Sequence, residues 1–302
     1  MPPTHISFAG ILQAHESWLK DPHAGRRADL TGITLNDLDC AGANLKQARL
    51  TGATLLDAVL SSADFSGASM ERVDLQRANL AGADLAGANL TSAVLAGAWL
   101  QEANLSEVIA LETIFKKAHM NKVRMLEASV QDASFAGVSA AGASFHQSRF
   151  YEADFTNSNL DNAQFYHARL HHTRLIGVSA KGTNFGGAKL DHCDFSRARL
   201  DDAKFTRAEV VQCTFRDASL PRADFREARL RGGDFNRASL DGARFGEASL
   251  QGADLRGASL LGARELTPEQ LVQALTDGDT ILPSGRRGPY MRNSGAEKPR
   301  KP

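Results

Sequence analysis

The chain has few of the residues that build ordinary globular cores and chemical sites. Its 302 residues include 7% aromatic side chains, two Trp and three Cys. Three cysteines form no disulfide framework, so we expect a reducing, cytoplasmic setting. No run approaches the ~18 apolar residues of a membrane helix, and the N-terminus lacks a basic segment followed by an apolar core. We therefore expect no membrane association and no export by the general secretory route.

An excess of charge of either sign is also absent. The sequence holds 35 Lys and Arg against 35 Asp and Glu. Attraction to nucleic acid or to an anionic membrane requires a surplus of Lys and Arg, so we expect no direct nucleic-acid binding. The charge is unevenly distributed, because residues 28–107 hold 10 acidic and 4 basic residues. One end of the repeat region is therefore acidic.

Catalytic signatures are missing too. The sequence has no Gly-rich phosphate loop, no His-Glu-x-x-His, no Gly-x-Ser-x-Gly and no Cys-x-x-Cys. Its many acidic residues recur at repeat positions where Asp and Asn satisfy backbone groups at corners. We predict that the protein is not an enzyme and has no catalytic, cofactor-binding or metal-binding residues.

The dominant feature of the sequence is a period of five residues. From Leu30 to Leu260, 38 of the 47 positions at this spacing are Leu or Phe, and the position two residues earlier is Ala in 32 of 47 cases. A period of five matches neither the 3.6 residues of a helix nor the two of a strand. It predicts a chain that turns a corner every five residues and stacks its turns around a narrow interior.

The repeat has a recognisable consensus. Ala78–Gly82 reads Ala-Asn-Leu-Ala-Gly and Ala253–Gly257 reads Ala-Asp-Leu-Arg-Gly. The run over residues 28–262 resembles the pentapeptide-repeat proteins. The resemblance implies an all-β solenoid, namely a right-handed quadrilateral parallel β-helix with about twenty residues per coil. About twelve coils at the strand spacing of roughly 4.8 Å would form a rod on the order of 55 Å long.

Both flanks of the repeats predict short capping helices. Apolar residues at three- and four-residue spacing predict a helix over residues 7–20, and Thr267-Pro268-Glu269-Gln270 begins a second helix, to about residue 277. Such helices cover strand edges that would otherwise recruit other chains, although a terminal helix is also a candidate homodimer contact. We expect an N-terminal cap at 1–27, repeats at 28–265, a C-terminal cap at 266–283 and a disordered basic tail at 284–302.

Reading the core at twenty-residue spacing predicts two opposed Phe ladders crossed by Leu ladders, which gives a constant volume per layer. One ladder holds Phe145, Phe165, Phe185, Phe205, Phe225 and Phe245, and the other holds Phe195, Phe215 and Phe235. Cys193 and Cys213 lie one coil apart, about 5 Å between Cα atoms, which a disulfide accepts. In a reducing compartment we favour two buried thiols, and Cys40 is also expected to be buried.

The first candidate site is a set of apolar residues at outward positions that elsewhere hold Asp, Asn, Ser or Arg. An exposed apolar patch on a solvated surface indicates contact with a partner. The alternative is a local distortion over residues 108–126, with a bulge or short helix that buries these residues. The set, which is the predicted partner-binding surface, consists of Val94, Trp99, Ile109, Leu111 and Ile114.

The second candidate site is rich in histidine and tyrosine. Twenty-residue spacing predicts stacking of His146 on Tyr166, Tyr151 on His171, and His172 on His192. The patch is a hypothetical partner surface, a pH-sensitive contact or an adventitious metal site, and scattered exposed residues are the alternative to all three.

Three functional hypotheses remain. The first is a non-enzymatic protein–protein interaction scaffold with an unidentified protein partner. The resemblance implies a second, since some pentapeptide-repeat proteins mimic duplex DNA, bind DNA gyrase and protect it; a topoisomerase is then the partner. The acidic bias covers residues 28–107 only, which weakens this hypothesis. The third, an accessory or effector role in bacterial secretion, rests on analogy alone.

Overall fold

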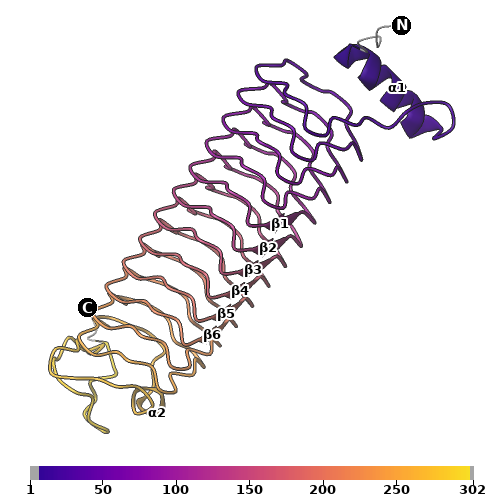
Figure 1. Ribbon diagram of the computed structural model, residues 1–302. Helices are drawn as coiled ribbons and strands as arrows, with labels where there is room; N and C mark the ends of the chain where they lie inside the picture. The colour runs from indigo at the N-terminus through magenta and orange to yellow at the C-terminus, as the bar shows by residue number, and fades with distance from the viewer. Residues whose placement is uncertain (1–6, 300–302) are drawn as a thin grey trace, which may run out of the picture. The chain divides into compact units, whose positions relative to one another are not determined.

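The computed structural model describes residues 7–299 (Figure 1). These residues form two compact units, residues 7–134 and 135–299. Each unit is a parallel β-solenoid. The region predicted as one run of repeats, 28–265, is divided between them. Because the repeats of a solenoid contact only their neighbours, compact units can form within one run of repeats.

In the coils of the first unit, one outward residue in every five pairs with the residue 20 positions later. Parallel bridges join Asp64 to Asp84 and Asn79 to Trp99. Two coils pair over longer segments and form strands β1, Ile109–Leu111, and β2, Ser129–Gln131. We call a set of residues at this spacing, stacked coil upon coil, a column. The register confirms the predicted twenty residues per coil.

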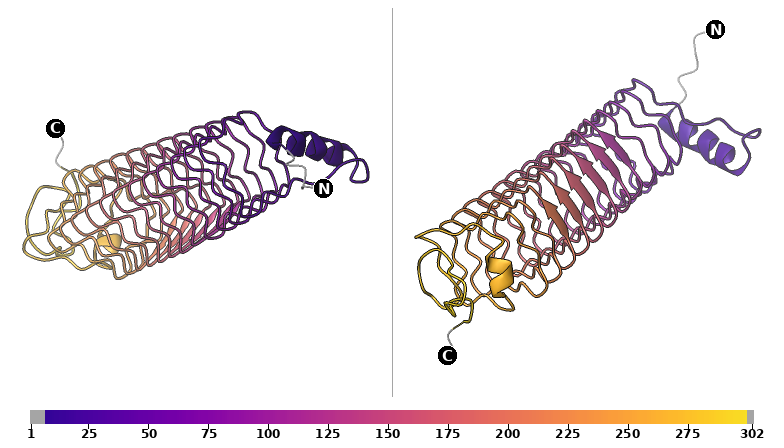
Figure 2. Two further views of the ribbon diagram at one scale, coloured as in Figure 1. Left: turned by 45° about the horizontal axis from the view of Figure 1, so that its top comes forward. Right: turned by 90° about the horizontal axis from the view of Figure 1, so that it is seen from below.

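The second unit follows the same rule. Its strands are β3 (Arg149–Tyr151), β4 (Arg169–His171), β5 (Lys189–Asp191) and β6 (Glu209–Val211), which pair in parallel in that order. Figure 2 shows these short strands side by side along one face of the unit. The handedness and the number of about twelve coils stay predictions.

The interior holds the Leu and Phe register, as predicted. Rings one coil apart stack, with centroids 5.0 Å apart for Phe185 and Phe205 and 4.9 Å for Phe195 and Phe215. The two ladders meet edge to face, because the Phe195 and Phe205 rings lie 6.2 Å apart at 83°. Offset and edge-to-face contacts are the favoured geometries of aromatic pairs, so the ladders pack without repulsion between ring faces.

The three cysteines are buried and free. The backbone N–H of Cys193 donates to Sγ of Cys213 at 3.4 Å. Burial raises the pKa of Cys213 far above its ordinary value and that of Cys40 to about 11. Both are therefore protonated, unreactive thiols, and the prediction of unpaired core cysteines is confirmed.

The corners are closed by acidic and amide side chains. Oδ1 of Asp64 accepts a hydrogen bond from the N–H of Ser66 at 2.8 Å, and Oδ1 of Asp84 accepts one from Ala86 at 3.0 Å. Such turns satisfy a backbone donor that no neighbouring coil reaches. Many acidic residues of the repeats therefore serve the backbone.

Helix α1, Phe8–Lys20, lies at the N-terminal end of the first unit (Figure 1). Its buried His15 accepts a hydrogen bond at Nδ1 from the N–H of Ala28 (3.1 Å), while Nε2 donates to the carbonyl of Lys46 (2.9 Å). Burial lowers the pKa of His15, which favours the neutral tautomer that these bonds require. The helix is therefore fixed to the first coils as a cap.

Helix α2 is shorter than predicted. It covers Pro268–Leu271 only, with the predicted capping box between Thr267 and Gln270. The expectation of a helix to about residue 277 is wrong, because Leu275 pairs with Asp254 and Ile281 pairs with Ser259 in parallel bridges. The pairing of the chain with the last coils competes with helix propagation after one turn.

The segment after residue 283 is ordered as far as the structure describes it. The N–H of Ser284 donates to the carbonyl of Ala296 at 3.1 Å, and Ile281 pairs antiparallel with Arg287. Ala296 and Glu297 are buried. The predicted disordered tail is therefore wrong for residues 284–299. This segment has few apolar side chains to bury, but backbone hydrogen bonds hold it in a folded-back conformation. Residues 1–6 of the predicted N-terminal cap and 300–302 of the tail lie outside the described residues.

The Phe ladder allows a stability test. Phe205→Ala removes a fully buried ring stacked on both sides, so we expect the free energy of unfolding to fall by about 3–5 kcal/mol. The exposed Lys181→Ala should change it by less than about 0.5 kcal/mol. Denaturant titration measures both, and equal losses would show that the inward register is misassigned.

The corner acids predict a dependence of stability on pH. Hydrogen bonds from the Arg256 guanidinium lower the pKa of Asp254 from 3.8 to about 2. A folded-state pKa below the unfolded value stabilises the fold above pH 3.8, and this contribution is lost as the pH falls toward 2. Asp254→Asn keeps the turn acceptor and removes the charge. We expect it to cost about 1 kcal/mol at neutral pH, since Arg256 is solvent-exposed, and much less near pH 2, where about half of the Asp254 carboxyl is protonated.

Denaturant titrations of the wild type and Asp254→Asn across this pH range measure the difference. A difference that stays constant from neutral pH to pH 2 would contradict the assignment.

Candidate functional site

The first candidate surface is the apolar cluster, which consists of Val94, Trp99, Ile109, Leu111 and Ile114. Parallel bridges join Val94 to Ile114 and Trp99 to His119. The coil register thus continues through residues 108–126, and the alternative of a bulge or short helix there is wrong. The apolar side chains occupy ordinary outward positions of a regular coil.

Their exposure is unusual for large apolar residues. Trp99 is 47% exposed, Ile109 43% and Ile114 39%, while Val94 and Leu111 are half-buried. Outward positions alternate with the buried register, so these side chains have no way into the core. Their apolar area stays in contact with water unless another molecule covers it.

The cluster extends over three faces of the first unit. Val94 and Ile114 share one column, Ile109 and Leu111 lie on β1 on the face before it, and Trp99 lies on the face after it. The Trp99 ring is held by stacking on His119, with centroids 4.1 Å apart at 13°. A flat partner cannot contact Trp99 and Ile109 together.

The second candidate surface lies in the second unit and separates into two groups. His146 contacts Tyr166 with ring centroids 6.2 Å apart. The other group, which we call the imidazole cluster, consists of Tyr151, His171, His172 and His192. The predicted contacts are present, because Tyr151 lies 5.2 Å from His171 and His172 lies 4.9 Å from His192.

A carboxylate that the sequence analysis missed holds the imidazole cluster together. Nδ1 of His171 lies 2.7 Å from Oδ2 of Asp191, and Nδ1 of His192 lies 2.8 Å from Oδ1. His171 and His172 are 4.2 Å apart between ring centroids. Asp191 lies in the column of His171, one coil later, so reading charges at twenty-residue spacing would have found it.

Two searches over residues 7–299 were negative. No group of three or more His, Cys, Asp or Glu side chains is arranged to hold a metal ion. No helix in this part of the chain is long and apolar enough to cross a membrane.

The acidic residues that a DNA mimic would use are engaged in the fold. Asp64 and Asp84 share a column, while Asp74 lies ten residues, half a coil, from each of them and so faces the opposite way. All three are half-buried and accept the backbone N–H two residues on, as Asp74 does from Gln76 at 3.1 Å. They form no continuous acidic surface.

Comparison with solved structures finds pentapeptide repeat proteins. HetL, involved in heterocyst differentiation regulation in the cyanobacterium Nostoc, is 24% identical with a TM-score of 0.29, over 89% of this chain and 97% of HetL. QnrB1, a plasmid-mediated fluoroquinolone resistance protein, is 16% identical with a TM-score of 0.28, over 56% and 91%. TM-scores this low support no argument about function.

A protein from the thylakoid lumen of Arabidopsis thaliana is 30% identical over 32% of this chain and 74% of its own, with a TM-score of 0.21. A search of curated proteins gives no significant match. The model for the pentapeptide repeat region matches residues 88–165 and 148–225, and the model for pentapeptide repeats in eight copies matches 39–77, 68–106, 208–246 and 233–264. Together the matches cover residues 39–264 without a gap, and the chain belongs to the pentapeptide-repeat family.

Proposed function

We propose that the protein is a non-enzymatic interaction scaffold that docks a protein partner on the apolar cluster. The observation that carries the proposal is the exposure of Trp99, Ile109 and Ile114 on a regular coil. Burying a fully exposed side chain of this size contributes about 1.5–3 kcal/mol, so covering these roughly half-exposed side chains contributes about half of that each.

The backbone beneath the cluster supports a preformed docking surface. The N–H of Ile109 donates to the carbonyl of Ala88 at 3.1 Å, and the carbonyl of Ile109 accepts from Leu90 at 2.8 Å. A surface fixed in this way loses little conformational entropy on binding. Because the cluster covers three faces, the fitting partner has a concave surface or two arms that enclose the column of Val94 and Ile114.

The alternative is that the protein mimics DNA and acts on a topoisomerase. Duplex mimicry requires acidic groups spaced over a continuous surface. Asp64, Asp74 and Asp84 face opposite directions and cap turns. This arrangement favours the scaffold over the mimic.

A pulldown tests the proposal. Trp99→Asp with Ile114→Asp places two charges in the proposed interface, and burying an unpaired charge costs more than about 2 kcal/mol, so we expect at least a tenfold loss of partner recovery. Thr54→Asp with Ser69→Asp is the matched control. It adds the same charge at outward positions in the columns of Ile114 and Ile109, on other coils of the same unit. Circular dichroism confirms folding of both variants.

The mimic predicts the opposite result. A triple variant tests this, with the substitutions Asp64→Asn, Asp74→Asn and Asp84→Asn. Each substitution keeps the side-chain oxygen that accepts the turn hydrogen bond and removes the charge. If partner recovery survives in the apolar double variant but disappears in this triple variant, the scaffold proposal is wrong. A gyrase supercoiling assay with the triple variant then identifies a topoisomerase as the target, and high salt should weaken that binding sharply.

A further inference from the structure

A column of cations runs along the face formed by β3, β4 and β5. Arg149 pairs with Arg169, and Arg169 pairs with Lys189, one coil apart each time. All three are exposed, and strand spacing separates them by about 4.8 Å at the backbone. Like charges directly opposite each other on neighbouring strands are destabilising. The column therefore opposes folding.

Compensation by acidic neighbours is incomplete. Lys189 Nζ lies 3.5 Å from Glu209, which Arg229 also approaches at 3.4 Å. Neither Arg149 nor Arg169 makes an ion pair with any residue in the described range 7–299. Two uncompensated guanidinium groups thus lie side by side on the surface of the second unit.

The imidazole cluster lies in the next columns of the same face. Strands β3, β4 and β5 begin at the three cations and end at Tyr151, His171 and Asp191.

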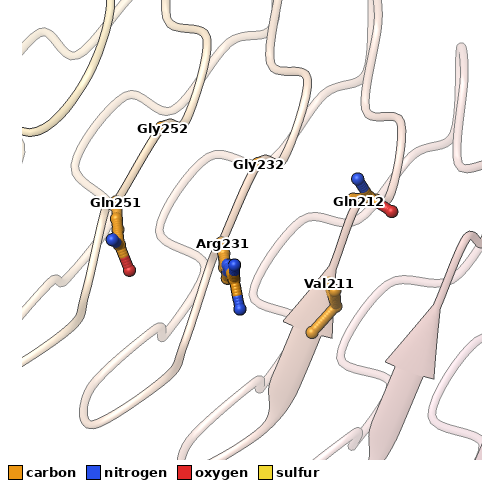
Figure 3. Close-up of a pocket in the computed structure, with 6 residues that line it drawn as sticks. All are labelled: Val211, Gln212, Arg231, Gly232, Gln251 and Gly252. Carbon is orange, nitrogen blue, oxygen red and sulfur yellow. The ribbon is translucent and has the colours of Figure 1, made fainter.

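The same columns continue into a trough of about 390 Å³, lined by Val211, Gln212, Arg231, Gly232, Gln251 and Gly252 (Figure 3). Gly232 and Gly252 stack at the corner with φ of 65° and 68°, and a Cβ on Gly252 would point at the N of Gly232 4.0 Å away. The backbone is exposed at this corner because it carries no side chains, while the N–H groups of Gly232 and Gly252 donate to the carbonyls of Gln251 (3.0 Å) and Gln273 (2.9 Å). Gln251 and Arg231 supply hydrogen-bond donors beside it.

We propose that this cationic face, from Arg149 to the trough, binds an extended acidic segment of a protein partner. Arginine forms bidentate contacts with carboxylates. The trough offers the side-chain amide of Gln251 and the guanidinium of Arg231 as donors to a peptide chain. The surface thus carries both charge complementarity and a path for the ligand.

A peptide fits the face better than a nucleic acid. Glu152, Asp191 and Glu209 lie among the cations. A nucleic acid presents a phosphate at every nucleotide and would meet these carboxylates, whereas a peptide can place neutral residues opposite them. The inference is independent of the apolar cluster, because all residues of the cationic face belong to the second unit and the apolar cluster belongs to the first.

Fluorescence anisotropy with the full chain tests the inference, with a labelled peptide of alternating Glu and Gly as the probe. We expect Arg149→Ser with Arg169→Ser to weaken binding roughly 3- to 10-fold, as expected for two exposed ion pairs. Arg199→Ser, an exposed arginine on another face of the same unit, is the matched control and should change binding less than about 2-fold. Trp99→Asp should leave this binding unchanged, which separates it from the proposed scaffold function.

Three results would overturn the inference. The first is equal binding by Arg149→Ser with Arg169→Ser and by Arg199→Ser. The second is the absence of saturable peptide binding by the wild type at low salt. The third is tighter binding of a single-stranded oligonucleotide than of the acidic peptide at equal charge, which would assign the face to nucleic acid.

Discussion

The backbone pairing of residues 20 positions apart is the constraint on which the rest of the structure depends. It makes every outward side chain a neighbour of the same position on the next coil. A run of similar residues in one column therefore becomes a continuous surface. The apolar pair Val94 and Ile114 and the basic set Arg149, Arg169 and Lys189 arise in this way.

The corners impose a second constraint on how surface charge is used. The second turn residue adopts a left-handed conformation at every coil, even where it is not glycine, as for Arg237 at φ 56°. That conformation is costly for residues with a Cβ. Contacts between coils offset part of the cost, since the Arg237 guanidinium donates to Asp217 at 2.7 Å. Charges at corners thus hold the coils together and are poor indicators of a binding surface.

The sequence alone predicts the interior well and the surface only in part. One position in every five holds a large apolar side chain, such as Leu80 or Phe205, and one holds a small one. Only a chain that turns every five residues buries all of these side chains. The fold-back over residues 284–299 was missed because it depends on backbone hydrogen bonds such as that of Ser284 to Ala296. Twenty-residue spacing places the apolar cluster on neighbouring faces and Asp191 in the column of His171. The contact of Asp191 with the ring of His192 depends on side-chain geometry at a corner, which the spacing does not show.

Charge compensation within a column separates structural charges from candidate binding groups. Asp84 lies next to Asp64, yet Nδ2 of Asn104 donates to its Oδ1 at 2.9 Å, so a neighbour on the next coil relieves the repulsion. Glu209 does the same between Lys189 and Arg229. Arg149 and Arg169 have no such relief among the residues that the structure describes. In these columns the fold offers compensation to Asp84 and Lys189 and none to Arg149 and Arg169, so the like-charge pair of arginines departs from a purely structural use of charge.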